Sequence, residues 1–166
     1  MNKQNSRYLQ GVCFVGLFIL IHMLTFNPFF SLSIANAVPI MSISAVITVS
    51  FYYGEWMGFT TGVIYGIFAD AITSGSYCFN AVCLLLIGLL SGVALRKYLN
   101  RNIFSAMTLS ILASGAYFLA YGLIFTFRSN ALQGFEYLLL HCLPSAVYSA
   151  IFIVPFYFLG KIIKKI

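Results

Sequence analysis

The side chains that could perform acid–base or metal chemistry are few in this chain and widely spaced. The carboxylates are Glu55, Asp70 and Glu136. General acid–base catalysis needs such groups within reach of one substrate, yet the predicted helices place Glu55 at one end of the molecule and the other two at the opposite end. The histidines and cysteines lie singly on apolar segments and form no metal-binding spacing. We therefore expect no metal, no cofactor and no enzymatic activity.

The most regular spacing in the chain joins Gly58, Gly62, Gly66 and Asp70, which follow one another at intervals of four. On a helix this interval places all four residues along one ridge. Glycine is a poor helix former in water, but in a bilayer small residues spaced by four let two helices make close contact. The pattern predicts a ridge for helix packing or for binding a partner.

Two later stretches have the same spacing, Gly88 with Gly92 and Ser110 with Ser114. We expect the ridge that begins at Gly58 to pack against Gly88 and Gly92, because a short turn makes their helices neighbours. The alternative is that one of these surfaces faces another protein.

Asp70 ends the glycine ridge near the outer end of its helix. A carboxylate is costly in lipid and has to face protein or water. Two interpretations are open. Asp70 is either a polar cap beside the turn at 74–76, or a hydrogen-bonding anchor that fixes the corner between two helices with Asn80 or Arg128 as its partner. Proton transfer is disfavoured because no second ionisable group lies in line with Asp70.

The composition predicts an all-α integral membrane protein. Of the 166 residues, 61% are hydrophobic and 7% are charged, and the mean hydropathy is +0.98, whereas soluble domains carry about 25% charged residues. The apolar runs are continuous and lack the alternation of a membrane β-barrel. We expect a single six-helix domain over 1–166.

Charges and turn residues divide the chain into six predicted transmembrane helices. Their bounds are 8–26, 34–53, 55–73, 77–95, 103–127 and 137–160. The third ends at the turn Ser74-Gly75-Ser76. The connection Tyr53-Gly54-Glu55 is very short, which is compatible with a shorter, tilted or broken pair of helices there.

The basic residues predict that both termini are cytoplasmic. Eight of the nine lie before the first helix, between the fourth and fifth, or after the sixth, and six crossings place these three segments on one side. An excess of Lys and Arg marks the cytoplasmic side, so Arg96, Lys97 and Arg101 are predicted to determine topology. This bias explains the net charge of +6 without a nucleic-acid partner, and it favours contact with anionic membrane lipid.

The stretch from Gly58 to Asp70, followed by Ser74-Gly75-Ser76 and Phe79-Asn80-Ala81, resembles MreD, the rod shape-determining membrane protein of bacteria. The chain length, the predicted cytoplasmic termini and the basic loop at 96–101 are also similar to that family. The family usually has a glycine-rich third span, an aspartate, a short Gly/Ser turn and an Asn-Ala entry into the next helix. The chain departs from this pattern at Cys78, where glycine is expected.

The resemblance implies a non-enzymatic scaffold or regulator of the bacterial cell-elongation complex in the cytoplasmic membrane. Such a protein binds the bitopic protein MreC. It acts with the MreB filament, the RodA glycosyltransferase and a class B penicillin-binding protein in peptidoglycan synthesis along the cell side. On this interpretation Gly58, Gly62 and Gly66 serve packing, while Asp70 and Asn80 fix the outer corner.

The alternative is a substrate-binding S component of an energy-coupling-factor vitamin transporter. These proteins are also six-helix bundles of similar size with a similar third span, so the fold could be shared. A vitamin site needs several convergent polar and aromatic groups, and the outer half of this chain offers few. The first helix also lacks the Ala-x-x-x-Ala ridge expected for docking to the coupling subunit. We therefore favour the MreD-like interpretation.

Overall fold

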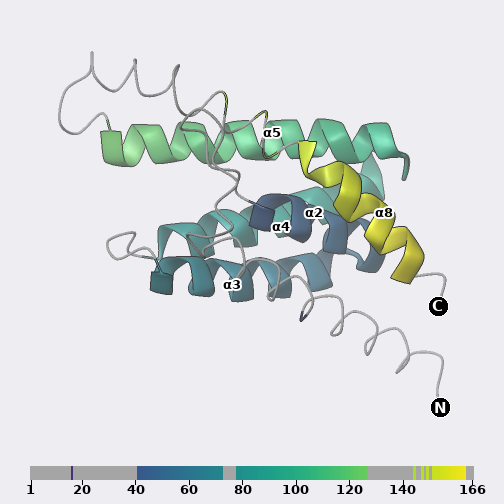
Figure 1. Cartoon of the computed structure of the whole chain (residues 1–166), viewed down its shortest axis with the longest axis horizontal. Coiled ribbons are helices and arrows are strands. Elements are labelled where there is room, and N and C mark those ends of the chain that lie inside the picture. Colours follow the sequence, from purple (N-terminus) through teal and green to yellow (C-terminus); the bar gives the residue numbers. More distant parts are fainter. Residues whose placement is uncertain are drawn as a thin grey trace.

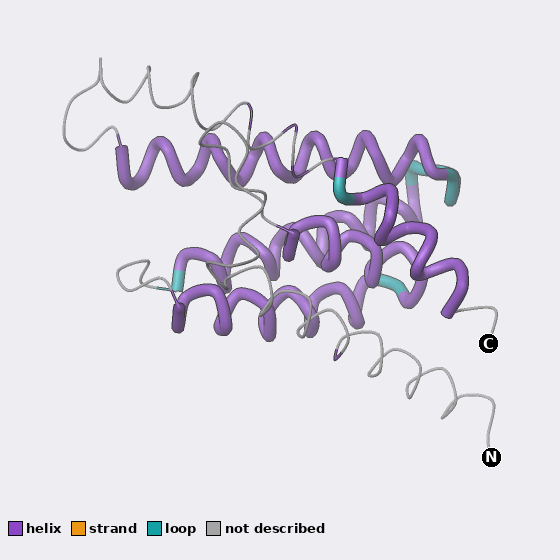
Figure 2. Tube along the Cα trace, viewed as in Figure 1, coloured by secondary structure: helices purple, strands orange, loops and turns teal. Residues whose placement is uncertain are grey.

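The computed structural model describes Gly16, residues 41–72 and 78–126, Pro144, Val147, Ser149 and residues 151–163. In this part of the chain every regular element is helical and no strand occurs, which confirms the predicted all-α class for these residues. The helices are α2 (Met41–Tyr53), α3 (Glu55–Ile72), α4 (Phe79–Lys97), α5 (Ile103–Tyr121) and α8 (Ile153–Ile163), with a π-helical segment η2 (Gly122–Thr126) directly after α5 (Figures 1 and 2).

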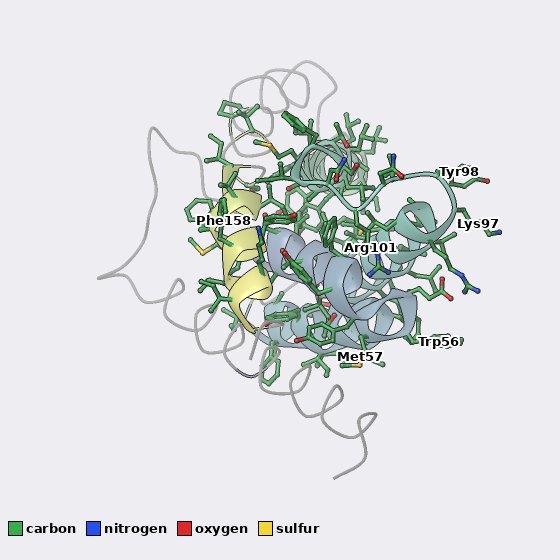
Figure 3. The ribbon with its side chains drawn as sticks, turned by 90° about the vertical axis from the view of Figure 1, so that its right-hand side faces the viewer. Trp56, Met57, Lys97, Tyr98, Arg101 and Phe158 are labelled. Carbon is green, nitrogen blue, oxygen red and sulfur yellow. The ribbon has the colours of Figure 1, made fainter. Side chains whose placement is uncertain are left out.

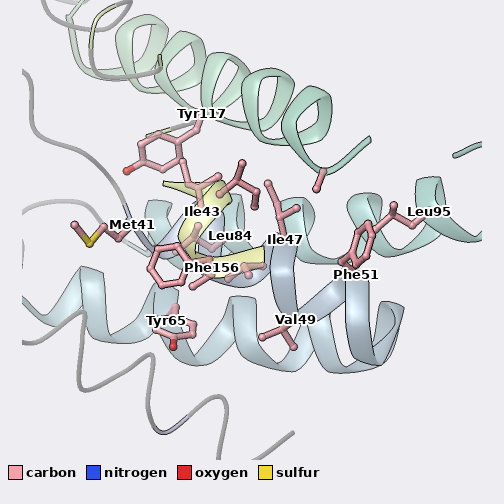
Figure 4. Packing of buried hydrophobic residues seen from close by; sticks show 14 residues of the cluster. Met41, Ile43, Ile47, Val49, Phe51, Tyr65, Leu84, Leu95, Tyr117 and Phe156 are labelled. Atoms are coloured by element: carbon pink, nitrogen blue, oxygen red, sulfur yellow. The ribbon is translucent and has the colours of Figure 1, made fainter. Parts of the chain in front are cut away.

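Helix α2 is central to this arrangement. In Figure 1, α3 and α4 lie side by side, α5 runs along the opposite side of the molecule, α2 lies between them, and α8 crosses at one end. Every residue of α2 from Met41 to Phe51 is buried. Apolar side chains such as Ile43 and Ile47 project from it among Tyr65 and Leu84 of the neighbouring helices (Figure 4). A helix without charged side chains suits such a position, and the hydroxyls of Ser44, Thr48 and Ser50 donate to backbone carbonyl oxygens.

A single residue, Gly54, separates α2 from α3. Its φ angle is +95°, which residues with a side chain rarely adopt. The Gly54 amide donates to the Ser50 carbonyl oxygen at 3.0 Å, and the Gly58 amide donates to the Gly54 carbonyl oxygen at 3.0 Å. The predicted short connection at 53–55 is therefore a one-residue change of direction, and hydrogen bonding continues across it.

Two predicted helix ends differ from the structure at α4 and α5. Helix α4 continues to Lys97 and does not end at 95, because basic side chains are favourable beside the carbonyl end of a helix. The α-helix predicted over 103–127 ends at Tyr121, and the chain then continues with π-helical geometry from Gly122. Glycine weakens regular helical structure, so the change of winding occurs where the helix is intrinsically least stable.

The last predicted helix, over 137–160, is interrupted within its described part. A turn at Phe152 precedes α8, which then extends beyond the predicted end to Ile163. Pro155 accounts for the interruption, since it has no amide proton to donate to the carbonyl of Ile151 and its ring crowds that carbonyl. The predicted helix 8–26, residues 34–40 and the turn at 74–76 lie outside the described residues, apart from the helical Gly16.

Among the described residues, two helical segments are long and apolar enough to cross a membrane, Phe79–Lys97 and Ile103–Ile124. In the most apolar stretch of each, only 33% and 22% of the residues, respectively, are buried inside the molecule. Much of their apolar surface therefore faces outward, for example at Val82, Leu86 and Leu90 along one side of α4.

Candidate functional site

The glycine ridge of α3 lies directly against the backbone of α4. A Cβ atom built on Gly62 would come within 3.0 Å of backbone atoms of Leu84, and one built on Gly66 would come equally close to Ala81. Cβ atoms in real structures essentially never approach other atoms so closely. The two helices therefore meet backbone to backbone, which is possible only because these positions carry no side chain.

The glycines of α4 complete this contact from the other side. Gly88 lies against the carbonyl group of Gly58, and Gly92 lies against the backbone of Glu55. The two ridges of small residues thus meet within one chain. In α5, by contrast, no atom of the described residues outside the backbone of the helix itself lies within 4 Å of a Cβ built on Gly115, so close packing against them does not require glycine there.

Ser50 joins the glycine contact to the central helix. Its hydroxyl oxygen lies 2.9 Å from the carbonyl oxygen of Gly88 in α4 and 3.0 Å from that of Val46 in α2, so it can donate to either. A Cβ built on Gly58 would collide with this hydroxyl. Three helices therefore meet at one point, and a glycine is needed there to leave room for a hydrogen bond.

Asp70 caps the start of α4 from the end of α3. Its carboxylate oxygens accept hydrogen bonds from the backbone amides of Asn80 at 3.1 Å and Ala81 at 2.9 Å. Amides in the first turn of a helix have no partner within that helix, and the helix dipole favours a negative charge beside them. The N-cap residue itself, Cys78, makes no such side-chain bond. Asp70 therefore takes over the role usually played by an N-cap side chain.

Asn80 extends this anchor to a third helix. Its side chain is buried, and its Oδ1 accepts a hydrogen bond from the hydroxyl of Tyr117 in α5. The ring of Phe79 lies 5.7 Å from that of Tyr117 and 5.9 Å from that of Tyr121, between centroids. We call Asp70, Phe79, Asn80 and Tyr117 the Asp70 corner; it holds the end of α3, the start of α4 and the end of α5 together.

The sequence predicted part of this corner. Two interpretations of Asp70 were open, a polar cap beside the turn at 74–76 and an anchor of the helix corner, and the bonds to the start of α4 correspond to the second. Of the two partners considered, Asn80 contributes its backbone amide, while Arg128 lies outside the described residues. Tyr117 was not predicted to belong to this corner. A signal was available, because Tyr117 continues the buried face of α5 that contains Ser110 and Ser114.

The opposite end of the same helices carries charge. Arg96 Nη1 lies 2.6 Å from Glu55 Oε1 and links the end of α4 to the start of α3. Lys97 and Arg101, which were predicted to determine topology together with Arg96, are exposed at this end. The described residues thus divide into a polar corner at one end of the α3–α4 pair and a basic surface at the other.

The described residues include no group of three His, Cys, Asp or Glu side chains able to hold a metal ion. Cys78 and Cys83 are free thiols. His22, His141 and Glu136 lie outside the described residues. What this arrangement does chemically is to fix helices to one another through hydrogen bonds and close backbone contact.

No protein-family model, no curated protein and no solved structure matches this chain.

Proposed function

We propose that this chain is a multi-pass protein of the bacterial cytoplasmic membrane, with six spans and both termini in the cytoplasm. The outward apolar surfaces of α4 and α5 support this, because water penalises exposed apolar side chains and lipid does not. The strong bias of Lys and Arg toward three segments on one predicted side supports the orientation.

We propose further that the protein is a non-enzymatic scaffold of the cell-elongation complex and binds an MreC-like bitopic protein. RodA, a class B penicillin-binding protein and the MreB filament would be the wider partners. One observation carries this proposal: within the stretch that resembles MreD, the described parts of α3 and α4 are in direct backbone contact, and the Asp70 carboxylate binds the start of α4. Such a helix pair is a rigid block suited to presenting its outer faces to other transmembrane helices.

The same observation weighs against the capture of a vitamin. A small-molecule site needs polar groups that point into it and remain available to the ligand. Here the carboxylate of Asp70 binds the start of α4, and the side chain of Asn80 binds Tyr117. The polar groups of this end therefore stabilise the helix pair.

Depletion and purification in the source organism test the proposal. Depletion of the protein should produce rounded cells, and affinity purification of the full-length tagged protein from membranes should recover a bitopic membrane protein. Normal cell shape after depletion, together with recovery of an ATPase module and a bound vitamin, would instead identify an S component and overturn the proposal.

A further inference from the structure

The end of the molecule at the α4–α5 connection combines basic and aromatic side chains. Figure 3 views this end and shows Lys97, Tyr98 and Trp56 projecting at its rim, with Arg101 nearer the centre. Tyr98 and Trp56 are 81% and 76% exposed. Large aromatic side chains with this exposure next to Lys and Arg are typical of the membrane–water interface, where the ring meets lipid and the polar atom meets water.

The balance of charge at this end is positive. Glu55 is the acidic side chain that the described residues place here, and it is paired with Arg96. The other described carboxylate, Asp70, is held at the opposite end of α3 by the start of α4. Lys97 and Arg101 therefore face outward without a described acidic partner.

We propose that Lys97 and Arg101 bind the headgroups of anionic phospholipids, with Trp56 and Tyr98 holding this end at the depth of those headgroups. A phosphate in the headgroup layer complements two exposed cations, one at the end of α4 and one on the short connection to α5. The inference rests on the part of the proposed function that places the chain in a membrane with this end on the inner side. It adds a lipid selectivity that the proposed scaffold role does not require.

Trp56 provides the measurement, because it is the single tryptophan of the chain. Full-length protein is reconstituted in two kinds of vesicle with equal amounts of phosphatidylglycerol and phosphatidylcholine. They differ only in which of the two lipids carries bromine, a short-range quencher of tryptophan fluorescence. We expect stronger quenching by brominated phosphatidylglycerol, with a local enrichment on the order of fivefold per cation. Raising the salt concentration should reduce this preference.

Two pairs of substitutions locate the effect. Lys97→Gln with Arg101→Gln should make quenching by the two brominated lipids equal. Lys164→Gln with Lys165→Gln removes the same charge from the C-terminal segment and should leave the preference unchanged. If the parent protein shows no preference, or if both pairs abolish it equally, the inference is wrong.

This experiment separates the inference from the proposed function. Equal quenching by both lipids would overturn the lipid selectivity while leaving the membrane scaffold intact. No quenching by either lipid would place Trp56 away from the bilayer and contradict the proposed membrane arrangement as well. If soluble glycerol phosphate abolished the preference at constant ionic strength, the cations would be a site for free phosphate, and the lipid assignment would fail.

Discussion

At the scale of single residues, Asp70 joins the end of α3 to the start of α4 through its side chain. Its carboxylate binds two amides of α4 whose partners would otherwise be missing. We expect Asp70→Ala to lower the free energy of unfolding by about 1–2 kcal/mol, because it removes both the capping bonds and the favourable charge at the helix start. Thermal denaturation in detergent measures the loss, and hydrogen exchange of the Asn80 and Ala81 amides should accelerate.

Asp70→Asn is the matched control for this change. Its amide oxygen can still accept a hydrogen bond from the start of α4, but the negative charge is gone, so we expect a smaller loss than for alanine. Unchanged stability and unchanged amide exchange in Asp70→Ala would mean that the corner is held by other contacts.

For individual residues, some roles could be predicted from the sequence and others could not. An aspartate at the end of an apolar ridge has to be satisfied, so an anchoring role could be predicted for Asp70. The groups that donate to the Asp70 carboxylate could not be predicted, because they are backbone amides and every residue except proline has one. Cys78 adopts a left-handed conformation, with φ of +60°. Glycine adopts a left-handed backbone conformation without strain, which is a physical reason to expect glycine at position 78. The conformation of this residue becomes visible only in the structure.

At the scale of elements, the α3–α4 contact reverses the usual effect of replacing glycine. Alanine is normally a better helix former than glycine by about 1 kcal/mol. At Gly62 the added methyl group would collide with the backbone at Leu84. We expect Gly62→Ala to destabilise the protein by about 1–3 kcal/mol, because relief of the collision must separate two helices. Thermal denaturation in detergent measures this change.

Gly115 supplies the control on a neighbouring helix. Among the described residues, no atom beyond the backbone of α5 lies within 4 Å of a Cβ built there, so Gly115→Ala should be neutral or should stabilise the protein by up to about 1 kcal/mol. The prediction is therefore that the same substitution lowers the free energy of unfolding at Gly62 and leaves it unchanged or raises it at Gly115. If both proteins gained stability alike, the glycine ridge would not be in close contact with α4.

The pairing of α3 with α4 could be predicted because spacing by four is a property of sequence alone and a short turn limits which helices can meet. The irregular segments of the helices were harder to predict from the sequence. The change of winding at Gly122 and the interruption at Phe152 depend on local backbone geometry, although Pro155 in the sequence was a usable signal for the second. The burial of α2 from Met41 to Phe51 depends on the helices packed around it. The absence of charged residues in 41–53 is compatible with an interior position but does not specify these neighbours.

At the scale of the whole molecule, the two ends of the α3–α4 pair differ in a way that suits a membrane. One end has the exposed cations Lys97 and Arg101, which have no acidic partner among the described residues, and the other has a carboxylate bound to backbone amides. Helix α4 joins these ends over 19 residues, about 28 Å at 1.5 Å per residue, which is close to the thickness of the hydrocarbon core. The distribution of charge along the sequence predicted the same polarity.

This polarity predicts which reagents reach each end of α4 in intact cells. Cys78 is exposed and free at the start of the helix, and Asn100 is exposed just beyond its end. In a protein whose other cysteines are replaced by alanine, Cys78 should react with a membrane-impermeant maleimide added outside, and Cys78→Ala with Asn100→Cys should react only after the membrane is permeabilised. Labelling of both sites from outside, or of Asn100→Cys alone, would contradict the proposed orientation, because a single span of α4 requires its two ends to lie on opposite sides.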